Sequence, residues 1–182
     1  MNSETAPPAD RRWSLPRRLL HGLLALTVLF QTFSPEWMSK PWRDGSATGR
    51  LLFEWHEWGG LIAGLAAMAM AAGLWRRRAV RPAGGTGLAT VLAQSRLVLS
   101  GVPSLRIPQA STTRGLAHTV QVMGLALIGW FCVTGAAIWW VGAASDTAHR
   151  IGELHELAAP LLYLYLGGHI GMALLHRLGG GD

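Results

Sequence analysis

Three long stretches of this sequence contain no charged residue, and they limit the folds that the chain can adopt. Residues 58–75, 115–145 and 157–175 contain no Asp, Glu, Lys or Arg. Each is long enough for an α-helix to cross about 30 Å of hydrocarbon. Only 14% of the 182 residues are charged, against about 25% in soluble domains. The sequence therefore predicts an all-α membrane protein.

A fourth, weaker apolar stretch covers residues 19–34 and is interrupted by His21 and Gln31. It reaches spanning length only if its flanking segments lie in the membrane interfaces. We therefore expect a four-transmembrane-helix bundle over residues 15–178, preceded by a disordered N-terminal tail at 1–14. The expected helices cover about 15–36, 51–75, 116–142 and 151–177.

Basic residues are distributed unequally between the two ends of such a bundle. The end shared by both termini and the 76–115 loop holds twelve arginines, whereas the other end holds only Lys40, Arg43, Arg50 and Arg150. Because Lys and Arg accumulate in cytoplasmic loops, both termini are expected to be cytoplasmic. The arginines flank apolar stretches instead of clustering on a soluble surface, so the net charge of +6 does not indicate nucleic-acid binding.

The 76–115 loop is the one long soluble segment that this topology leaves. It contains seven arginines and no acidic residue. Its apolar middle, 88–99, is predicted either as a short amphipathic helix on an anionic leaflet or as part of a solvated basic loop. No small-x-small cleavage site follows Arg17 and Arg18, so the first helix is expected to remain in the protein. Cys132 is the only cysteine, which excludes a disulfide framework and covalent haem attachment.

Histidines recur in a pattern within the apolar stretches. Two similar tetrapeptides, EWHE at 54–57 and ELHE at 153–156, each open a long apolar stretch. An ionisable residue inside a membrane is costly and needs a partner. His56 and His155 stand near the outer ends of their helices, His21 near an inner end, and His169 fourteen residues after His155. On one helix, His169 would lie about 21 Å deeper than His155 and about 40° away, on the same face.

These depths predict two stacked pairs, His56 with His155 and His21 with His169. Two neutral imidazoles facing each other suit a low-spin haem with both axial positions filled, which serves electron transfer. Glycines lie near the histidines, among them Gly59 and Gly168. They would let a flat macrocycle approach the helix backbone, or they would serve helix–helix packing.

Other polar residues are candidates of lower rank. His118 and His176 lie near the inner ends of the third and fourth helices; His176 shares the face of His169, but using it would place the two sites about 31 Å apart. His149 is expected to be a solvated outer residue. Arg18 and Arg114 are candidates for pairing with haem propionates. The glutamates flanking His56 and His155 would accept hydrogen bonds from the rings, form an acidic docking rim, or be solvated.

Together these residues resemble the bacterial cytochrome b561 family, whose relatives include the dihaem cytochrome b subunits of membrane-bound nickel–iron hydrogenases and formate dehydrogenases. The resemblance covers about residues 15–178, and its most specific element is the spacing of His155 and His169. The other matching elements are Arg18-x-x-His21, His56-x-x-Gly59 and Arg114-x-x-x-His118. The chain departs from the family pattern at Gly22, where members often carry Trp, and in its longer 76–115 loop.

The resemblance implies transmembrane electron transfer through two haem b groups. It implies that His56 and His155 hold the periplasmic-side haem and that His21 and His169 hold the cytoplasmic-side haem. Quinone is the implied substrate, and His118 and His176 are candidates for its site near the inner haem. The expected partners are the quinone pool, membrane lipid, and either a c-type cytochrome or a dehydrogenase or hydrogenase subunit. Whether the chain is a monomer or a homodimer is left open.

Two other functions fit the same sequence. A haem-free membrane transporter would use the intramembrane histidines to carry protons or metal ions. A structural membrane anchor of a dehydrogenase complex would not need them for turnover. Haem content and the effect of replacing His169 separate these alternatives.

Overall fold

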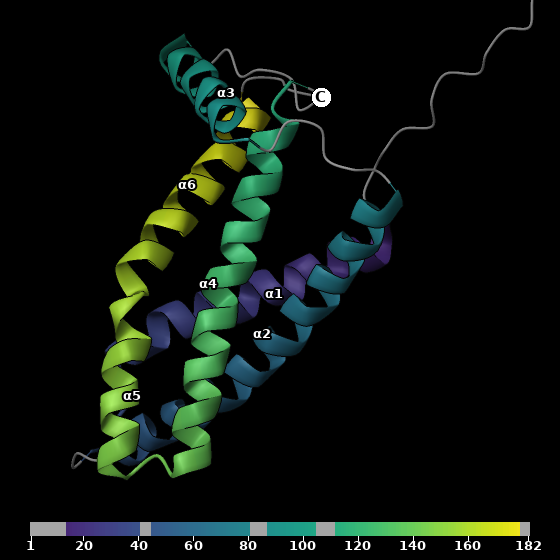
Figure 1. Cartoon of the computed structure of the whole chain (residues 1–182). Coiled ribbons are helices and arrows are strands. Elements are labelled where there is room, and N and C mark those ends of the chain that lie inside the picture. The colour runs from purple at the N-terminus through teal and green to yellow at the C-terminus, as the bar shows by residue number, and fades with distance from the viewer. Residues whose placement is uncertain (1–13, 41–44, 81–86, 105–111, 179–182) are drawn as a thin grey trace, which may run out of the picture.

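The computed structural model describes residues 14–40, 45–80, 87–104 and 112–178. Within these ranges the chain is helical and contains no strand, which confirms the predicted all-α class (Figure 1). The α-helices are α1 (Leu15–Phe33), α2 (Ala47–Val80), α3 (Leu88–Gly101), α4 (Arg114–Val141), α5 (Asp146–Leu157) and α6 (Ala159–Leu178). Two short 3₁₀-helices, η1 (Ser34–Glu36) and η2 (Val102–Ser104), follow α1 and α3.

In the part of the chain that the structure describes, three helical stretches are long and apolar enough to cross a membrane: Ala47–Arg76, Arg114–Val141 and Asp146–Leu178. They correspond to α2, to α4, and to α5 with α6. The nineteen-residue α1 carries Arg17 and Arg18 in its first turn and is not among the three. Its crossing of the membrane, and with it the four-span topology, stays a prediction.

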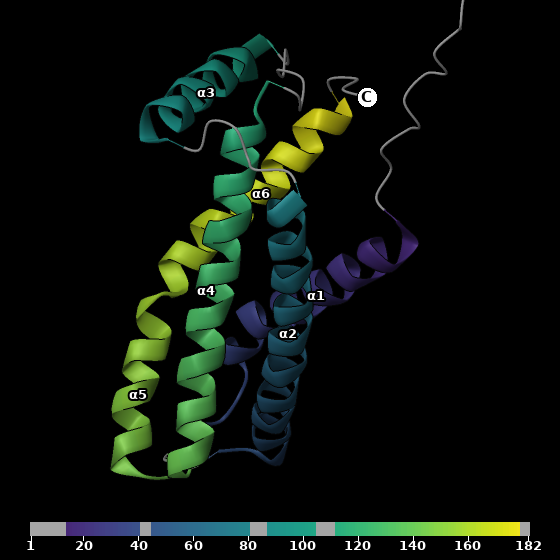
Figure 2. The same ribbon diagram turned by 45° about the vertical axis from the view of Figure 1, so that its right-hand side comes forward.

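The helices pack through small side chains. Ala63, Ala66 and Ala67 of α2 are buried together with Leu24 of α1 and Leu162 of α6. In a bilayer the hydrophobic effect does not drive helices together, so small residues that allow close backbone approach contribute the van der Waals contacts. Helix α1 packs mainly on α2 and crosses it obliquely (Figure 2).

The predicted helix 151–177 is interrupted. It consists of α5 and α6, which meet at Ala158, three residues after His155. Pro160 explains the interruption, because proline lacks an amide hydrogen and disfavours helical geometry in the residue before it. Helix α5 also begins earlier than expected, because the Ser145 hydroxyl caps its first turn by accepting a hydrogen bond from the Ala148 amide at 3.1 Å. The depth estimate for His169 assumed an uninterrupted helix, whereas the structure divides this stretch at Ala158; Asp146–Leu178 still forms one helical stretch of spanning length.

The apolar middle of the long loop forms α3, so this segment is a helix and not an irregular solvated loop. Helix α3 lies across the end of the bundle where α4 begins and α6 ends (Figure 1, Figure 2). Val98 is buried there, and Gln94 Oε1 accepts a hydrogen bond from the Leu116 amide at 2.7 Å. That amide belongs to the first turn of α4, where helix amides have no partner in their own helix. Contact of α3 with lipid stays a prediction.

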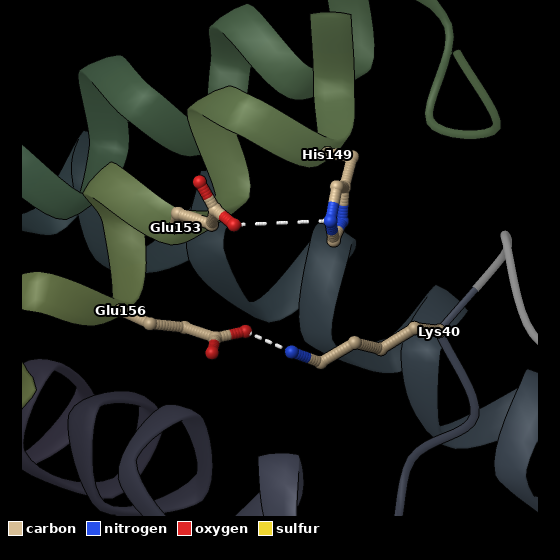
Figure 3. A network of polar contacts seen from close by, with 4 residues as sticks. All are labelled: Lys40, His149, Glu153 and Glu156. Carbon is tan, nitrogen blue, oxygen red and sulfur yellow. Dashed lines mark hydrogen bonds and ion pairs between the residues drawn. The ribbon is translucent and has the colours of Figure 1, made fainter. Parts of the chain in front are cut away.

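Ion pairs occur at the opposite end of the bundle (Figure 3). Lys40, in the segment before α2, pairs with Glu156 of α5. On the same helix, His149 Nε2 lies 3.8 Å from Glu153 Oε1, and both side chains are at least half exposed. Such exposed pairs contribute little to stability. Of the two pairs, only Lys40–Glu156 joins different segments, the one before α2 and α5.

Candidate functional site

The structure brings four histidines together in two pairs, each formed by different helices. The rings of His56 (α2) and His155 (α5) have centroids 6.3 Å apart and planes inclined by 68°. The rings of His21 (α1) and His169 (α6) have centroids 6.1 Å apart and planes inclined by 23°. These are the pairs that the sequence spacing predicts. That the four rings bind iron is not tested by this geometry alone and stays a prediction.

The separation of the rings fits a metal ion between them. Two imidazoles on opposite sides of a metal have centroids about 6 Å apart, given metal–nitrogen bonds of about 2 Å. Aromatic rings in direct contact have centroids about 4.5–7 Å apart, so distance alone does not distinguish the two arrangements. The hydrogen bonds of the rings show, in addition, which ring nitrogen is left to bind a metal.

Both rings of the outer pair are held by hydroxyl groups. Ser34 Oγ lies 2.8 Å from His56 Nδ1, and Thr134 Oγ1 lies 2.7 Å from His155 Nδ1. The two hydroxyl-bearing residues are themselves buried. With Nδ1 occupied, Nε2 is the ring nitrogen left to bind a metal, which is how proteins commonly orient a ligating histidine. The donor set of the outer pair therefore fits axial ligation of haem iron.

In the contacts that the structure shows, the glutamates next to His56 and His155 do not accept hydrogen bonds from the imidazole rings. Glu156 pairs with Lys40, and Glu153 is directed toward His149 (Figure 3). Hydroxyls from outside α5 are used at the rings instead. Sequence reasoning missed them because Ser34 and Thr134 precede their histidines by 22 and 21 residues, so no local motif joins donor and acceptor.

The glycines near the histidines have different surroundings. A Cβ atom at Gly59 would collide with Gln31 Nε2 and lie 3.5 Å from Phe30 Cδ1. Gly59 therefore allows α1 and α2 to pack closely, which is the helix–helix packing role and not that of making room for a macrocycle. Gly135 was not singled out from the sequence; a Cβ atom there would lie 3.5 Å from Cε1 of His155. At Gly168 no atom lies within 4 Å of a Cβ position, which leaves open space beside His169.

A buried donor where α1 meets α2 has no acceptor among the described residues. Gln31 Nε2 is buried and has no hydrogen-bond partner among the residues that the structure describes. Buried polar groups are almost always paired. An acceptor supplied by a bound group next to α1 and α2 would satisfy this amide.

His169 of the inner pair is backed by a tyrosine. The ring of Tyr165, one helical turn earlier, is nearly parallel to that of His169, with centroids 5.6 Å apart and planes inclined by 10°. The Tyr165 hydroxyl lies against Gly124 of α4, where any Cβ atom would overlap it. The missing side chain at Gly124 therefore makes room for the ring that supports His169.

This fit predicts the effect of adding one methyl group. Gly124→Ala is expected to lower the free energy of unfolding by about 1–3 kcal/mol, because the new methyl group displaces the Tyr165 ring. Gly129→Ala on the same helix is the matched control, since a Cβ atom there has no neighbour within 4 Å. Thermal denaturation in detergent measures both variants. Equal midpoints for the two would contradict the role of Gly124.

The remaining candidates lie outside the two ring pairs. His176 Nδ1 is hydrogen-bonded to the Met172 carbonyl of its own helix at 2.8 Å. His118 lies in the second turn of α4. Arg18 and Arg114 are exposed near the beginnings of α1 and α4. Pairing of these arginines with propionates, and a quinone role for the two histidines, stay predictions.

Comparison with known proteins identifies the family. A family model described as prokaryotic cytochrome b561 matches residues 12–182. No curated protein and no solved structure gave a match. The matched region contains both histidine pairs and the three helical stretches that are able to cross a membrane. The chain therefore belongs to the prokaryotic cytochrome b561 family and is a multi-pass membrane protein that transfers electrons through haem b.

Proposed function

We propose that this cytochrome holds two haem b groups, one between each histidine pair, and moves electrons across the bacterial inner membrane between the quinone pool and a redox partner. The observation that carries the proposal is the meeting of four histidines in two pairs, with ring centroids 6.3 and 6.1 Å apart. Each pair draws its two rings from different helices, as a cofactor bound between helices requires.

Two imidazoles are a sufficient protein ligand set for haem but not for most other metal centres. The porphyrin already supplies four nitrogen ligands, so only the two axial positions remain to be filled. A zinc site, in contrast, takes three or four ligands from the protein. The paired arrangement thus favours haem over the metal-ion transporter considered from the sequence.

The residues of this chain set how the haem works. When bound, haem supplies one-electron redox chemistry. His56 and His155, like His21 and His169, would fill both axial positions, which leaves no open site for oxygen chemistry and favours electron transfer. The helices would fix the haem spacing, while hydrogen bonds and burial of the ligands would adjust the reduction potentials.

The inner end of the bundle is our candidate for quinone exchange. His118 and Arg114 of α4, with His176 of α6, belong to the helix ends near α3. The Nδ1 atom of His176 donates to Met172, so its Nε2 remains available to accept a proton. Electrons from a quinol would then enter the inner haem and continue to the outer one.

The outer end is our candidate for the redox partner. Glu54, Glu153 and Glu156 are exposed near the outer histidine pair. Carboxylates around such a site attract a basic protein surface and speed its association. A c-type cytochrome with a basic docking face suits this end, and a dehydrogenase or hydrogenase subunit is the alternative partner.

The proposal is tested by the colour and haem content of the purified protein. The full chain in detergent is expected to be red and to contain about two haem b groups per chain by the pyridine haemochrome assay, because both axial pairs bind iron. One haem per chain would contradict the two-site arrangement. A colourless, zinc-containing protein would favour the transporter instead.

A further inference from the structure

We propose that Thr134 of α4 is a positioning residue for the outer haem. Its hydroxyl accepts a hydrogen bond from the Nδ1–H group of His155 and so keeps Nε2 of that ring free to bind iron. The inference rests on the proposed function, in which His155 is an axial ligand. It adds that α4, which supplies no ligand to either pair, controls the ligand on α5.

The direction of this hydrogen bond follows from the other contacts of Thr134. A threonine hydroxyl has a single hydrogen to donate. Thr134 Oγ1 lies 2.7 Å from the carbonyl oxygen of Trp130 and 3.3 Å from that of Phe131. Carbonyl oxygens can only accept, so the hydroxyl hydrogen is used within α4. At 2.7 Å from His155 Nδ1, the Thr134 oxygen must therefore act as the acceptor.

This assignment determines the tautomer of His155. A neutral imidazole carries one hydrogen, on either Nδ1 or Nε2. If Nδ1 donates to Thr134, the hydrogen is on Nδ1, and Nε2 has a free lone pair. A lone pair on Nε2 is what an axial ligand must present. Without a fixed acceptor at Nδ1, the ring could also adopt the tautomer with Nε2–H, which cannot bind iron.

Neighbouring contacts from α4 hold the same segment of α5. The ring of Phe131 is nearly perpendicular to that of His155, with centroids 5.0 Å apart and planes inclined by 81°. Trp130 Nε1 donates to the carbonyl oxygen of Leu154 at 3.2 Å. That carbonyl belongs to the last turn of α5, where backbone acceptors lack partners in their own helix. Helix α4 therefore restrains both the backbone and the ring of this ligand.

Ser34 makes the corresponding contact with His56 at 2.8 Å. The direction of its hydrogen bond is not fixed by a second contact in the same way, so the inference is built on Thr134. Ser34→Ala is useful as a comparison, because it removes a hydroxyl from the opposite ligand of the same site.

Loss of the Thr134 hydroxyl as acceptor has a predictable effect on the midpoint potential of the outer haem iron. A hydrogen bond from Nδ1–H increases electron donation by the imidazole, which stabilises the ferric state. Thr134→Val removes the acceptor while keeping nearly the same shape. The midpoint potential of the outer haem is therefore expected to rise, while that of the inner haem stays unchanged. Affinity of the outer site for haem is expected to fall about 10–100-fold, the usual cost of removing such a partner, and haem should therefore leave that site faster.

The experiment compares three variants of the full haem-containing protein in detergent. Thr134→Val tests the acceptor, and Thr134→Ser should restore wild-type behaviour because serine keeps the hydroxyl. Thr32→Val is the matched control: Thr32 is also buried, and among the described residues its hydroxyl bonds only the Val28 carbonyl, at 2.7 Å. Redox titration gives the midpoint potentials, and transfer of haem to excess apomyoglobin gives the rate of haem loss. The transition missing in His155→Ala identifies the outer haem.

The outcomes distinguish this inference from the proposed function. A shift of the outer potential and faster haem loss in Thr134→Val alone support the inference. If Thr134→Val behaves like Thr32→Val while wild-type protein holds two haems, the inference is overturned and the proposed function stands. If Thr134→Val loses the outer haem completely, retention of that haem by Thr134→Ser supports the inference, and its loss there overturns it. Wild-type protein without haem would contradict both the inference and the proposed function.

Discussion

Replacing His155 with alanine is expected to reduce the haem content from about two groups per chain to about one. The physical reason is that the outer iron then loses one of its two axial ligands. Electron transfer between the two ends of the bundle should fall below detection, because the outer step of the path is missing. Pyridine haemochrome analysis measures the haem content, and quinol-driven reduction of an added c-type cytochrome measures the electron transfer between the two ends.

A matched control is available on the same helix. His149 also lies in α5, but it is exposed, close to Glu153 and outside both ring pairs. His149→Ala is therefore expected to keep both haems. The corresponding variants of His56, His21 and His169 should each lose one haem. If the His169 variant kept both haems while His176→Ala lost one, the inner ligand would be His176 and our assignment would be wrong.

The membrane-crossing helices could be predicted from the sequence because their signal is local. A stretch of eighteen or more residues without charge has few alternatives to a transmembrane helix, and α2, α4 and the pair α5 and α6 follow from it. The ends of the helices were less accurate. They depend on single contacts, such as the Ser145 cap of α5, whose importance the composition does not reveal.

The interruption of the helix at Ala158 could have been predicted from the sequence. Pro160 stands in the middle of the predicted fourth helix, and proline is a known cause of breaks even where surrounding residues favour a helix. We assumed an unbroken helix because the apolar stretch was continuous. The predicted pairing of His155 with His56 and of His169 with His21 nevertheless agrees with the structure, because a break of one residue leaves the order of depths unchanged.

The contacts that hold the rings could not be predicted, because they join residues that are distant in sequence. Thr134 reaches His155 only when α4 and α5 lie side by side. The fit of Tyr165 to Gly124 likewise depends on how α4 meets α6. Periodicity indicates which face of a helix is turned inward, but it does not indicate which residue of a neighbouring helix will be opposite. Such pairs require the tertiary structure.

The second large effect concerns the proposed quinone site at the inner end. His118→Ala is expected to slow the reduction of haem by a quinol about 100-fold or more, the range in which a positioned acid or base contributes to a reaction. Oxidation of a quinol releases protons together with electrons, and a ring at the inner end would accept one of them. Because His118 belongs to neither ring pair, the haem content should stay at the wild-type level. Stopped-flow absorbance of haem reduction measures the rate.

Dithionite separates a defect in quinol oxidation from a defect in the haems, because this small reductant needs no quinone site. In His118→Ala, dithionite should reduce both haems as fast as in wild-type protein, while the quinol does so slowly. His149→Ala, at the other end of the bundle, should behave as wild type with both reductants. A loss of haem in His118→Ala would show that this ring is a ligand and that the inner pair was misassigned. A wild-type quinol rate would place quinone exchange elsewhere, and the outer end would then be the place to search for it.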